Sequence, residues 1–301
     1  MFNTIISKLS SVKFRASEIK NLPSKIFLHP SSIIPFVFLF IFHLSLFTTH
    51  SASAQSYSPN TKNLDTVYVK DAKLANVMHV YVYDSAQFLY GAGKLVNGKK
   101  EGIWRSYFDN HFLYTVEEWQ NGKQNGYSVM LNSNGDLMKE ENYTDGVKDG
   151  LFKTYGPNGK LKMEENYVNG VQIGWRRTYY PEGGLQENGY FNKQGLRDSI
   201  NHWYYGNGKV LVEYLYVNGN INGPSVSYYE NGSKKSEGVL KNNFEEGAWI
   251  EYYDNGKKKA EGNYIAGKKT GTWKLYDEGG ELMKTQVWNN GVMASEKSVN
   301  K

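Results

Sequence analysis

Apolar and polar positions in this 301-residue chain recur with a period of 24 residues, each period opening on a glycine. The opening glycines are Gly102, Gly126, Gly150, Gly174, Gly223, Gly247 and Gly271. The single 49-residue step is two periods plus one inserted residue, and we place Ser199 there as a degenerate opener. Such self-similarity predicts a stack of one small unit rather than a single core around a cleft.

Two columns of large apolar side chains run through the units. Five residues after the opener stand Tyr107, Leu131, Tyr155, Tyr179, Tyr204, Tyr228, Tyr252 and Tyr276. Seventeen residues after it stand Trp119, Tyr143, Tyr167, Phe191, Tyr216, Leu240, Tyr264 and Trp288. We predict that these two columns are buried. A ninth, degenerate unit begins near Met78, so the array is predicted to cover residues 78–291.

Each unit carries two turn signals separated by short segments rich in aromatic and β-branched residues. Asn134-Gly135 is an example in the middle of a unit, and Asn121-Gly122 is an example near its end. Asn-Gly and Asp-Gly favour positive φ and therefore type I′ hairpin turns. The segments are too short for a helical apolar period. The predicted fold is all-β: an elongated, single-layer antiparallel array of β-hairpins forming a continuous meander.

The sequence of the unit resembles the MORN repeat in its bacterial variant form. The clearest copy runs from Gly247 to Gly267, with Trp249, Tyr252-Tyr253 and Asn255-Gly256 followed by Glu261-Gly262-Asn263-Tyr264. The resemblance extends over residues 78–291 and implies a MORN-like solenoid of hairpins. Members of that family are mostly scaffolds, membrane-associated modules or uncharacterised exported proteins, and some bacterial members carry an antitoxin label.

The first 54 residues have a different composition. A basic stretch is followed by an apolar run over 33–47 and by Ser51-Ala52-Ser53-Ala54. This order is typical of a secretory signal peptide, with cleavage predicted between Ala54 and Gln55; an uncleaved membrane anchor is the alternative. Residues 55–77 are polar with a possible cap strand at 66–69, and residues 292–301 are a predicted C-terminal tail.

Net charge excludes one class of partner. The chain has 35 basic and 30 acidic residues, of which the leader contains five and one, leaving 30 and 29 in the mature protein. A nearly neutral chain lacks the basic footprint of a nucleic-acid binder. There is no cysteine, hence no disulfide and no lipidated cysteine. We expect an exported protein, periplasmic or extracellular.

No catalytic constellation stands out. The mature chain has three histidines, His79, His111 and His202, at unrelated positions in the unit, and no phosphate-binding loop motif. The sequence predicts a protein that is not an enzyme and that has neither cofactor nor metal.

A column of carboxylates lies fourteen residues after the opener. Its members are Glu140, Glu164, Glu213, Glu237 and Glu261. We expect them to line up along the sheet, either paired with lysines of the opposite strand, such as Lys234 and Lys258, or binding cations. A glycan-processing role for Glu213, Glu237 or Glu261 is a weaker hypothesis.

The residues six positions after the opener are the predicted partner-binding row. They are Phe108, Tyr180, Tyr205, Tyr229 and Tyr253. Strand alternation should turn them away from the apolar column beside them, giving an exposed strip for a protein or for glycan rings. The alternative is that they cover the second face of the sheet against neighbouring strands.

Two function classes remain. The first is a non-catalytic exported scaffold that binds an envelope protein or polysaccharide through the sheet surface. The second is an antitoxin or immunity-type protein that binds and neutralises a toxin. Contact with a membrane is expected only through the leader.

Overall fold

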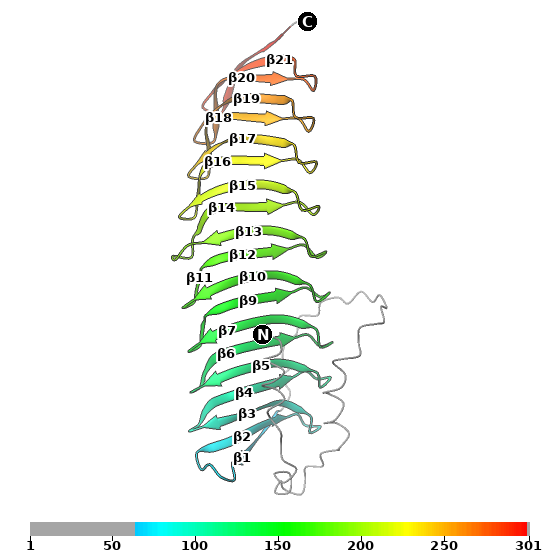
Figure 1. Cartoon of the computed structure of the whole chain (residues 1–301), viewed down its shortest axis with the longest axis vertical. Coiled ribbons are helices and arrows are strands. Elements are labelled where there is room, and N and C mark those ends of the chain that lie inside the picture. The colour runs from blue at the N-terminus through cyan, green and yellow to red at the C-terminus, as the bar shows by residue number, and fades with distance from the viewer. Residues whose placement is uncertain (1–63, 300–301) are drawn as a thin grey trace. The chain divides into compact units, whose positions relative to one another are not determined.

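The computed structural model describes residues 64–299 as a single layer of 22 antiparallel strands in one sheet (Figure 1). The fold class that the sequence predicts is therefore confirmed. The predicted signal peptide, 1–54, lies outside the described residues.

The strands follow one another in chain order. The first eleven are β1 Asp65–Lys70, β2 Val77–Tyr83, β3 Leu89–Val96, β4 Lys99–Tyr107, β5 Leu113–Gln120, β6 Lys123–Leu131, β7 Leu137–Thr144, β8 Val147–Lys148, β9 Gly150–Tyr155, β10 Leu161–Val168 and β11 Val171–Gln172. The others are β12 Gly174–Tyr179, β13 Leu185–Phe191, β14 Arg197–Tyr204, β15 Val210–Val217, β16 Asn220–Tyr228, β17 Lys234–Lys241, β18 Phe244–Tyr252, β19 Lys258–Ile265, β20 Lys268–Tyr276, β21 Leu282–Asn289 and β22 Val292–Ser298.

Pairing is between neighbours in the sequence, as a meander requires. β7 pairs with both β8 and β9, and β10 with both β11 and β12, so each two-residue strand and its successor form one interrupted strand. At the N-terminal edge, β1 includes the possible cap strand 66–69 and pairs with β2. At the other edge, most of the segment expected as a tail forms β22, which pairs with β21.

The two turns of each unit differ. Turns at the end of a unit are type I′, as predicted, with Asn121 and Gly122 both at positive φ, 51° and 82°. The turn between β13 and β14 is the exception, because only Gly195 has positive φ there and its N–H donates to the carbonyl of Asn192 at 2.9 Å. In the mid-unit turn only the glycine has positive φ, as at Gly135 with φ 87°, whose N–H donates to the carbonyl of Asn132 at 3.0 Å. The mid-unit turn is therefore a three-residue loop, a type I turn followed by a left-handed glycine. The type I′ prediction was wrong there, because Asn-Gly suits both geometries.

The opening residue of each unit forms a bulge inside a strand. Gly150 has φ 104° and Gly247 has φ 73°, in the left-handed region that favours glycine. Opposite Gly126, the register of β5 and β6 shifts between Glu117 and Trp119. Ser199 adopts φ 60°, which supports its placement as the opener of the unit that lacks a glycine.

The most buried column stands two residues after the opener and was not predicted. Trp273 and Asn201 are 0% exposed there, Phe152 is 4%, Ser225 5% and Ser128 6% exposed. The columns at positions five and seventeen are mostly half-buried, with Phe191 and Leu240 as buried exceptions. We call the side of the sheet that carries column two the core face, and the other side the open face.

Candidate functional site: the open face of the sheet

The predicted tyrosine row connects successive repeats. Each hydroxyl donates a hydrogen bond to a backbone carbonyl at the same turn of the next repeat. The bonds run from Tyr180 to Tyr204 (2.7 Å), from Tyr205 to Tyr228 (2.8 Å), from Tyr229 to Tyr252 (2.7 Å) and from Tyr253 to Tyr276 (2.9 Å). The row thus contributes to the cohesion of the array.

The exposure expected for this row is wrong. The four tyrosines are half-buried, and Phe108 is 8% exposed with its ring 4.6 Å from that of Tyr114. The sixth position begins the mid-unit turn, where strand alternation no longer applies: the Tyr180 N–H donates to Gly184 and its carbonyl accepts from Gly183. Binding of a partner by these rings stays a prediction.

Other side chains of the mid-unit turns make similar contacts between repeats. The Asn231 amide donates to the carbonyl of Asp254 at 3.0 Å, and the Lys209 ammonium donates to the carbonyl of Asn231 at 2.6 Å. Side-chain to backbone hydrogen bonds therefore join each mid-unit turn to the next. The polar groups that make these bonds stabilise the stacking of the repeats.

The carboxylate column bonds to the tyrosines of column five in the following repeat. Hydroxyls donate from Tyr155 to Glu140 (2.7 Å), from Tyr179 to Glu164 (2.9 Å), from Tyr276 to Glu261 (2.6 Å) and from Tyr252 to Glu237. Basic side chains complete the column: Arg177 lies 3.0 Å from Glu164, His202 lies 3.3 Å from Glu213, and Lys153 lies 4.0 Å from Glu140.

The expected pairing across strands occurs for Lys274, which lies 3.6 Å from Glu261, and for Lys153, whereas Lys234 and Lys258 pair within a strand. Lys234 lies 2.7 Å from Glu237, and Lys258 lies 2.7 Å from Glu261, each three residues apart on one strand. These lysines, followed by the tyrosine hydroxyls, lower the pKa of both carboxyl groups. Burial and then the carboxylate raise the pKa of Tyr276 to about 12. Glu237 and Glu261 are therefore stabilised as carboxylates that are already hydrogen-bonded.

The open face also carries an apolar patch. Eight side chains, each between 38% and 51% exposed, form it: Val147, Leu151, Val168, Val171, Trp175, Leu196, Ile200 and Val217. Exposed apolar residues are ordinary when scattered, but a contiguous group on a sheet face is typical of a binding surface. Sequence reasoning missed this patch because its columns are not uniformly apolar: the column of Val147, Val171 and Leu196 also holds Lys99, Lys123 and Lys268.

Strand pairing joins members of the patch to one another or to further apolar side chains. Val168 faces Val171 across β10 and β11, Ile200 faces Leu215 across β14 and β15, and Trp175 contacts Tyr190 with ring centroids 5.2 Å apart. Val147, Val171 and Leu196 occupy the third position before their openers. The patch lies beside the carboxylate column, on the side of the type I′ turns.

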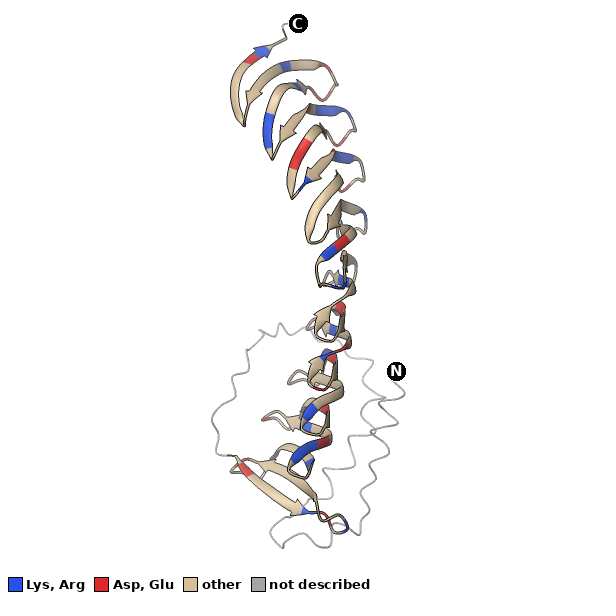
Figure 2. Cartoon of the chain, turned by 90° about the vertical axis from the view of Figure 1, so that its left-hand side faces the viewer, with Lys and Arg blue, Asp and Glu red and all other residues tan. Residues whose placement is uncertain are grey.

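Lysines flank the column formed by Val147, Val171 and Leu196. The same position, three before the opener, holds Lys99 and Lys123 in the preceding repeats and Lys268 beyond the patch. All three lysines are exposed. Elsewhere both signs of charge are interspersed along the sheet, as Figure 2 shows, so the patch is an apolar segment within a mixed surface.

Five segments of the chain match the profile of the MORN repeat variant, at residues 148–169, 203–218, 221–242, 245–266 and 269–290. The chain carries MORN repeats of the variant type. The resemblance noted in the sequence is thus confirmed. No curated protein matches the chain. MORN repeats are generally non-catalytic and form scaffolds for interaction with proteins or lipids.

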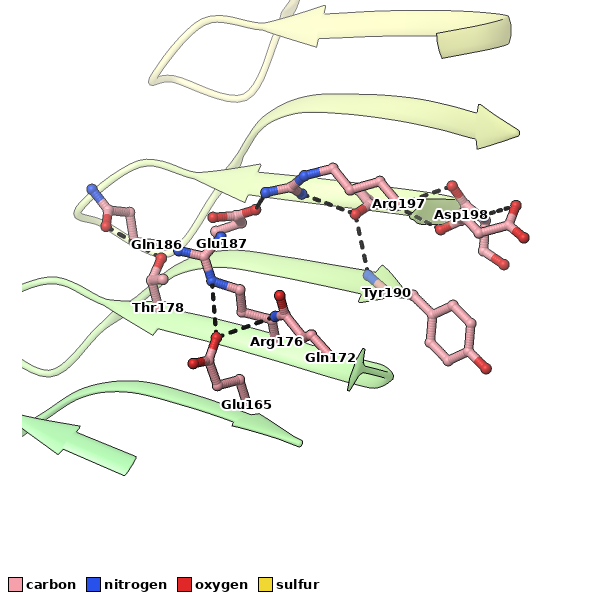
Figure 3. A network of polar contacts seen from close by, with 11 residues as sticks. Glu165, Gln172, Arg176, Thr178, Gln186, Glu187, Tyr190, Arg197 and Asp198 are labelled. Atoms are coloured by element: carbon pink, nitrogen blue, oxygen red, sulfur yellow. Dashed lines mark hydrogen bonds and ion pairs between the residues drawn. The ribbon is translucent and has the colours of Figure 1, made fainter. Parts of the chain in front are cut away.

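The MORN profile does not match residues 170–202, where a polar network interrupts the aromatic core (Figure 3). Column two there holds Arg176, whose Nε lies 3.9 Å from Glu165, and the fully buried Asn201. The Asn201 oxygen accepts from the Tyr190 N–H and from Arg197, both at 3.1 Å, and Arg197 also pairs with Glu187. Its amide group donates to the carbonyls of Asp198 and Ser199. Because Asn201 is fully hydrogen-bonded, its burial is tolerated.

Metal and membrane sites were considered over the same region. Within residues 64–299, no three His, Asp or Glu side chains gather closely enough to hold a metal ion. That region also contains no helix with the length and apolar character needed to cross a bilayer. A depression of about 400 Å³ between β18, β19 and β20 is lined partly by Gly247 and Gly271. Its one carboxylate, Glu246, accepts the Ala266 N–H at 2.9 Å.

Proposed function

We propose that this MORN-repeat protein is a non-catalytic, exported scaffold that binds an envelope protein through the apolar patch. The observation that supports the proposal is the patch itself: eight apolar side chains on three successive repeats, each more than a third exposed. Exposing that much apolar surface is unfavourable unless a partner covers it.

A protein is favoured over a polysaccharide as the partner. Sugar hydroxyls would require polar groups with free hydrogen-bonding capacity beside flat aromatic faces. On the open face, Tyr155, Tyr179 and Tyr276 already donate to the carboxylate column. Trp175 provides an exposed aromatic ring, but the other seven members of the patch are aliphatic. An aliphatic surface is better suited to apolar side chains of a protein.

A protein is also favoured over a lipid surface. Asp145 lies in the type I′ turn before Val147, Asp149 lies between β8 and β9, and Asp198 precedes Ile200 by two residues. Carboxylates at these places would approach anionic head groups as the patch entered the membrane. Charge repulsion of this kind opposes binding to anionic bilayers.

Capture from envelope extract tests the proposal. The full chain serves as bait beside a variant with Val147→Ser, Val171→Ser and Leu196→Ser. The matched control changes three apolar residues outside the patch that are between 43% and 70% exposed: Ile265→Ser, Val287→Ser and Val292→Ser. We expect the patch variant to lose a partner that the wild type and the control retain. Identical captured sets from all three baits, with β-structure intact by circular dichroism, would refute the proposal.

Export rests on the leader and has its own test. We expect the protein in the periplasmic or extracellular fraction, with Gln55 as the first residue by N-terminal sequencing. A cytoplasmic protein that retains residues 1–54 would contradict this part alone. In the antitoxin alternative, the captured partner would be a toxin whose activity the protein abolishes.

A further inference from the structure

We infer that the apolar patch binds an amphipathic helix of the partner protein, lying along the axis of the repeats with an acidic end over Lys99 and Lys123. This inference rests on the proposed function and specifies the binding element. It is carried by three features of the structure: the pairing of the strands beneath the patch, the spacing of the repeats, and the charge at one end.

The occupant must satisfy its own backbone hydrogen bonds. Among the strands beneath the patch, β9, β10 and β12 to β15 pair on both sides, whereas the two-residue β8 pairs with β7 and β11 pairs with β10. The longer strands leave no free edge for a peptide to extend the sheet, and the Lys148 carbonyl of β8 already accepts the Gly170 N–H at 2.8 Å. A segment lying on the face therefore gains contacts only through side chains, and a helix is the element whose backbone groups are bonded internally.

The spacing of the patch fits a heptad pattern. Successive repeats are two strands apart, about 9.6 Å at the usual spacing of about 4.8 Å. Seven residues of an α-helix advance about 10.5 Å. Three repeats contribute to the patch, so a helix of about three heptads would place an apolar side chain over each repeat, and a mismatch of about 1 Å per repeat stays small over this length.

Charge determines which end of the helix lies where. The column that contains Val147, Val171 and Leu196 continues toward the N-terminus as Lys123 and Lys99. In the other direction it continues as the uncharged Asn220 and Phe244. Both lysines are exposed, and the methylenes of Lys99 lie over Gly122 of the next turn, which places the ammonium group beside the helix path. Acidic residues at that end of the helix would be attracted, and basic residues repelled.

The experiment uses two synthetic 21-residue peptides. Each has three heptads with leucine at the two core positions and glutamine elsewhere, and the first heptad of one carries three glutamates where the other carries three lysines. Binding to the full chain is measured by fluorescence anisotropy, and by the emission of Trp175 as the difference between the wild type and Trp175→Phe. We expect the acidic peptide to bind and to shift the Trp175 emission.

Two variants separate the apolar and the charged contributions. Val171→Asp should weaken both peptides about tenfold or more, because a charge would be buried under the helix. Lys99→Glu with Lys123→Glu should weaken the acidic peptide several-fold and strengthen the basic one by a similar factor. Ile265→Asp is the matched control outside the patch and should change neither affinity. Val171→Thr, a smaller change, repeats the test if Val171→Asp does not fold.

Three outcomes would overturn the inference. One is equal affinity of Val171→Asp and wild type for the acidic peptide. Another is an equal effect of the lysine reversal on both peptides. The third is binding to vesicles of anionic phospholipid that Val171→Asp abolishes, without binding of either peptide. If peptide binding fails while the serine variant still loses its captured partner, the proposed function stands and the helix does not. If capture is unchanged as well, both the proposed function and the helix inference are refuted.

Discussion

The indole of Trp273 lies directly over Gly262 of the neighbouring strand, so that a Cβ at position 262 would come within 2.3 Å of the ring. The same relationship holds between Trp249 and Gly238, where the distance would be 2.0 Å. The sizes are reversed in another layer, where Tyr214 of β15 faces Ser225 of β16. In these layers of the MORN array, one large and one small side chain from successive repeats therefore fill the core together.

Gly262→Ala should be destabilising out of proportion to one methyl group. The ring of Trp273 is fully buried and cannot move without breaking its contacts with Tyr264 and Lys269. We expect a loss of about 1–3 kcal/mol in the free energy of unfolding, the usual cost of overpacking. Urea unfolding followed by tryptophan fluorescence measures it.

Gly206→Ala is the control for this substitution. Nothing lies within 4 Å of a Cβ at residue 206. Its φ is not in the left-handed region, so we expect a change of less than about 0.5 kcal/mol. Equal effects of the two substitutions would show that close packing under Trp273 is not what requires glycine at position 262.

Removing one hydroxyl of the tyrosine row should weaken the contact between two repeats. Tyr205→Phe deletes the 2.8 Å bond to the Tyr228 carbonyl and keeps the ring. We expect a loss of about 0.5–1.5 kcal/mol, measured by urea unfolding, and faster amide exchange near Tyr228. Tyr68→Phe, at a side chain 58% exposed in β1, is the comparison and should cost less.

The opening residues should respond in opposite directions to substitution. Gly247 has φ 73° with nothing within 4 Å of a Cβ, so the cost of Gly247→Ala is conformational, about 1–2 kcal/mol. Ser199 already adopts φ 60°, and Ser199→Gly relieves that strain. Thermal melting should show a lower midpoint for the first variant and an unchanged or higher midpoint for the second. A lower midpoint for Ser199→Gly comparable to that of Gly247→Ala would contradict the argument.

Stability should fall at alkaline pH. Burial, followed by a carboxylate, raises the pKa of Tyr252 and Tyr276 from the ordinary tyrosine value of 10.0 to about 12. Tyrosines whose pKa is raised in this way stabilise the fold below pH 10, where the hydroxyl is protonated in both the folded and the unfolded chain. Above that, the unfolded chain ionises first, so stability is lost between pH 10 and about 12. Circular dichroism against pH measures the loss, and Tyr252→Phe with Tyr276→Phe should make it smaller.

Stability should also fall at acid pH, because the carboxylates that accept hydrogen bonds from these tyrosines become protonated. The pKa of Glu237 and Glu261 is lowered, first by Lys234 and Lys258 and then by the tyrosine hydroxyls. Their contribution to stability is present above pH 4.5, the ordinary pKa of a glutamate carboxyl group, and is lost as the pH falls through the lowered pKa. Glu237→Gln should reduce the difference in stability between pH 7 and acid. A pH dependence identical to that of the wild type would contradict the role assigned to this carboxylate.

The sequence by itself determined the period, the hairpins and the family. Glycines such as Gly247 are needed at positive φ, and Asn-Gly pairs form tight turns, whatever the rest of the chain does. Because such requirements are local, the type of residue at a position is enough to indicate the backbone conformation there. The same reasoning anticipated that Ser199 stands in for a glycine, because the spacing of the turns leaves no other place for the bulge.

Only the tertiary structure decided which columns are buried and which surface stays open. Trp273 is buried because Gly262, a residue of the previous repeat, leaves room for its ring, and the sixth-position tyrosines bond to the following repeat because the turn redirects them. The apolar patch likewise arises where Val147, Val171 and Leu196 come side by side from separate repeats. Contacts between repeats depend on how a unit bends at its bulge and turns, and that geometry is a property of the stack rather than of any single 24-residue segment.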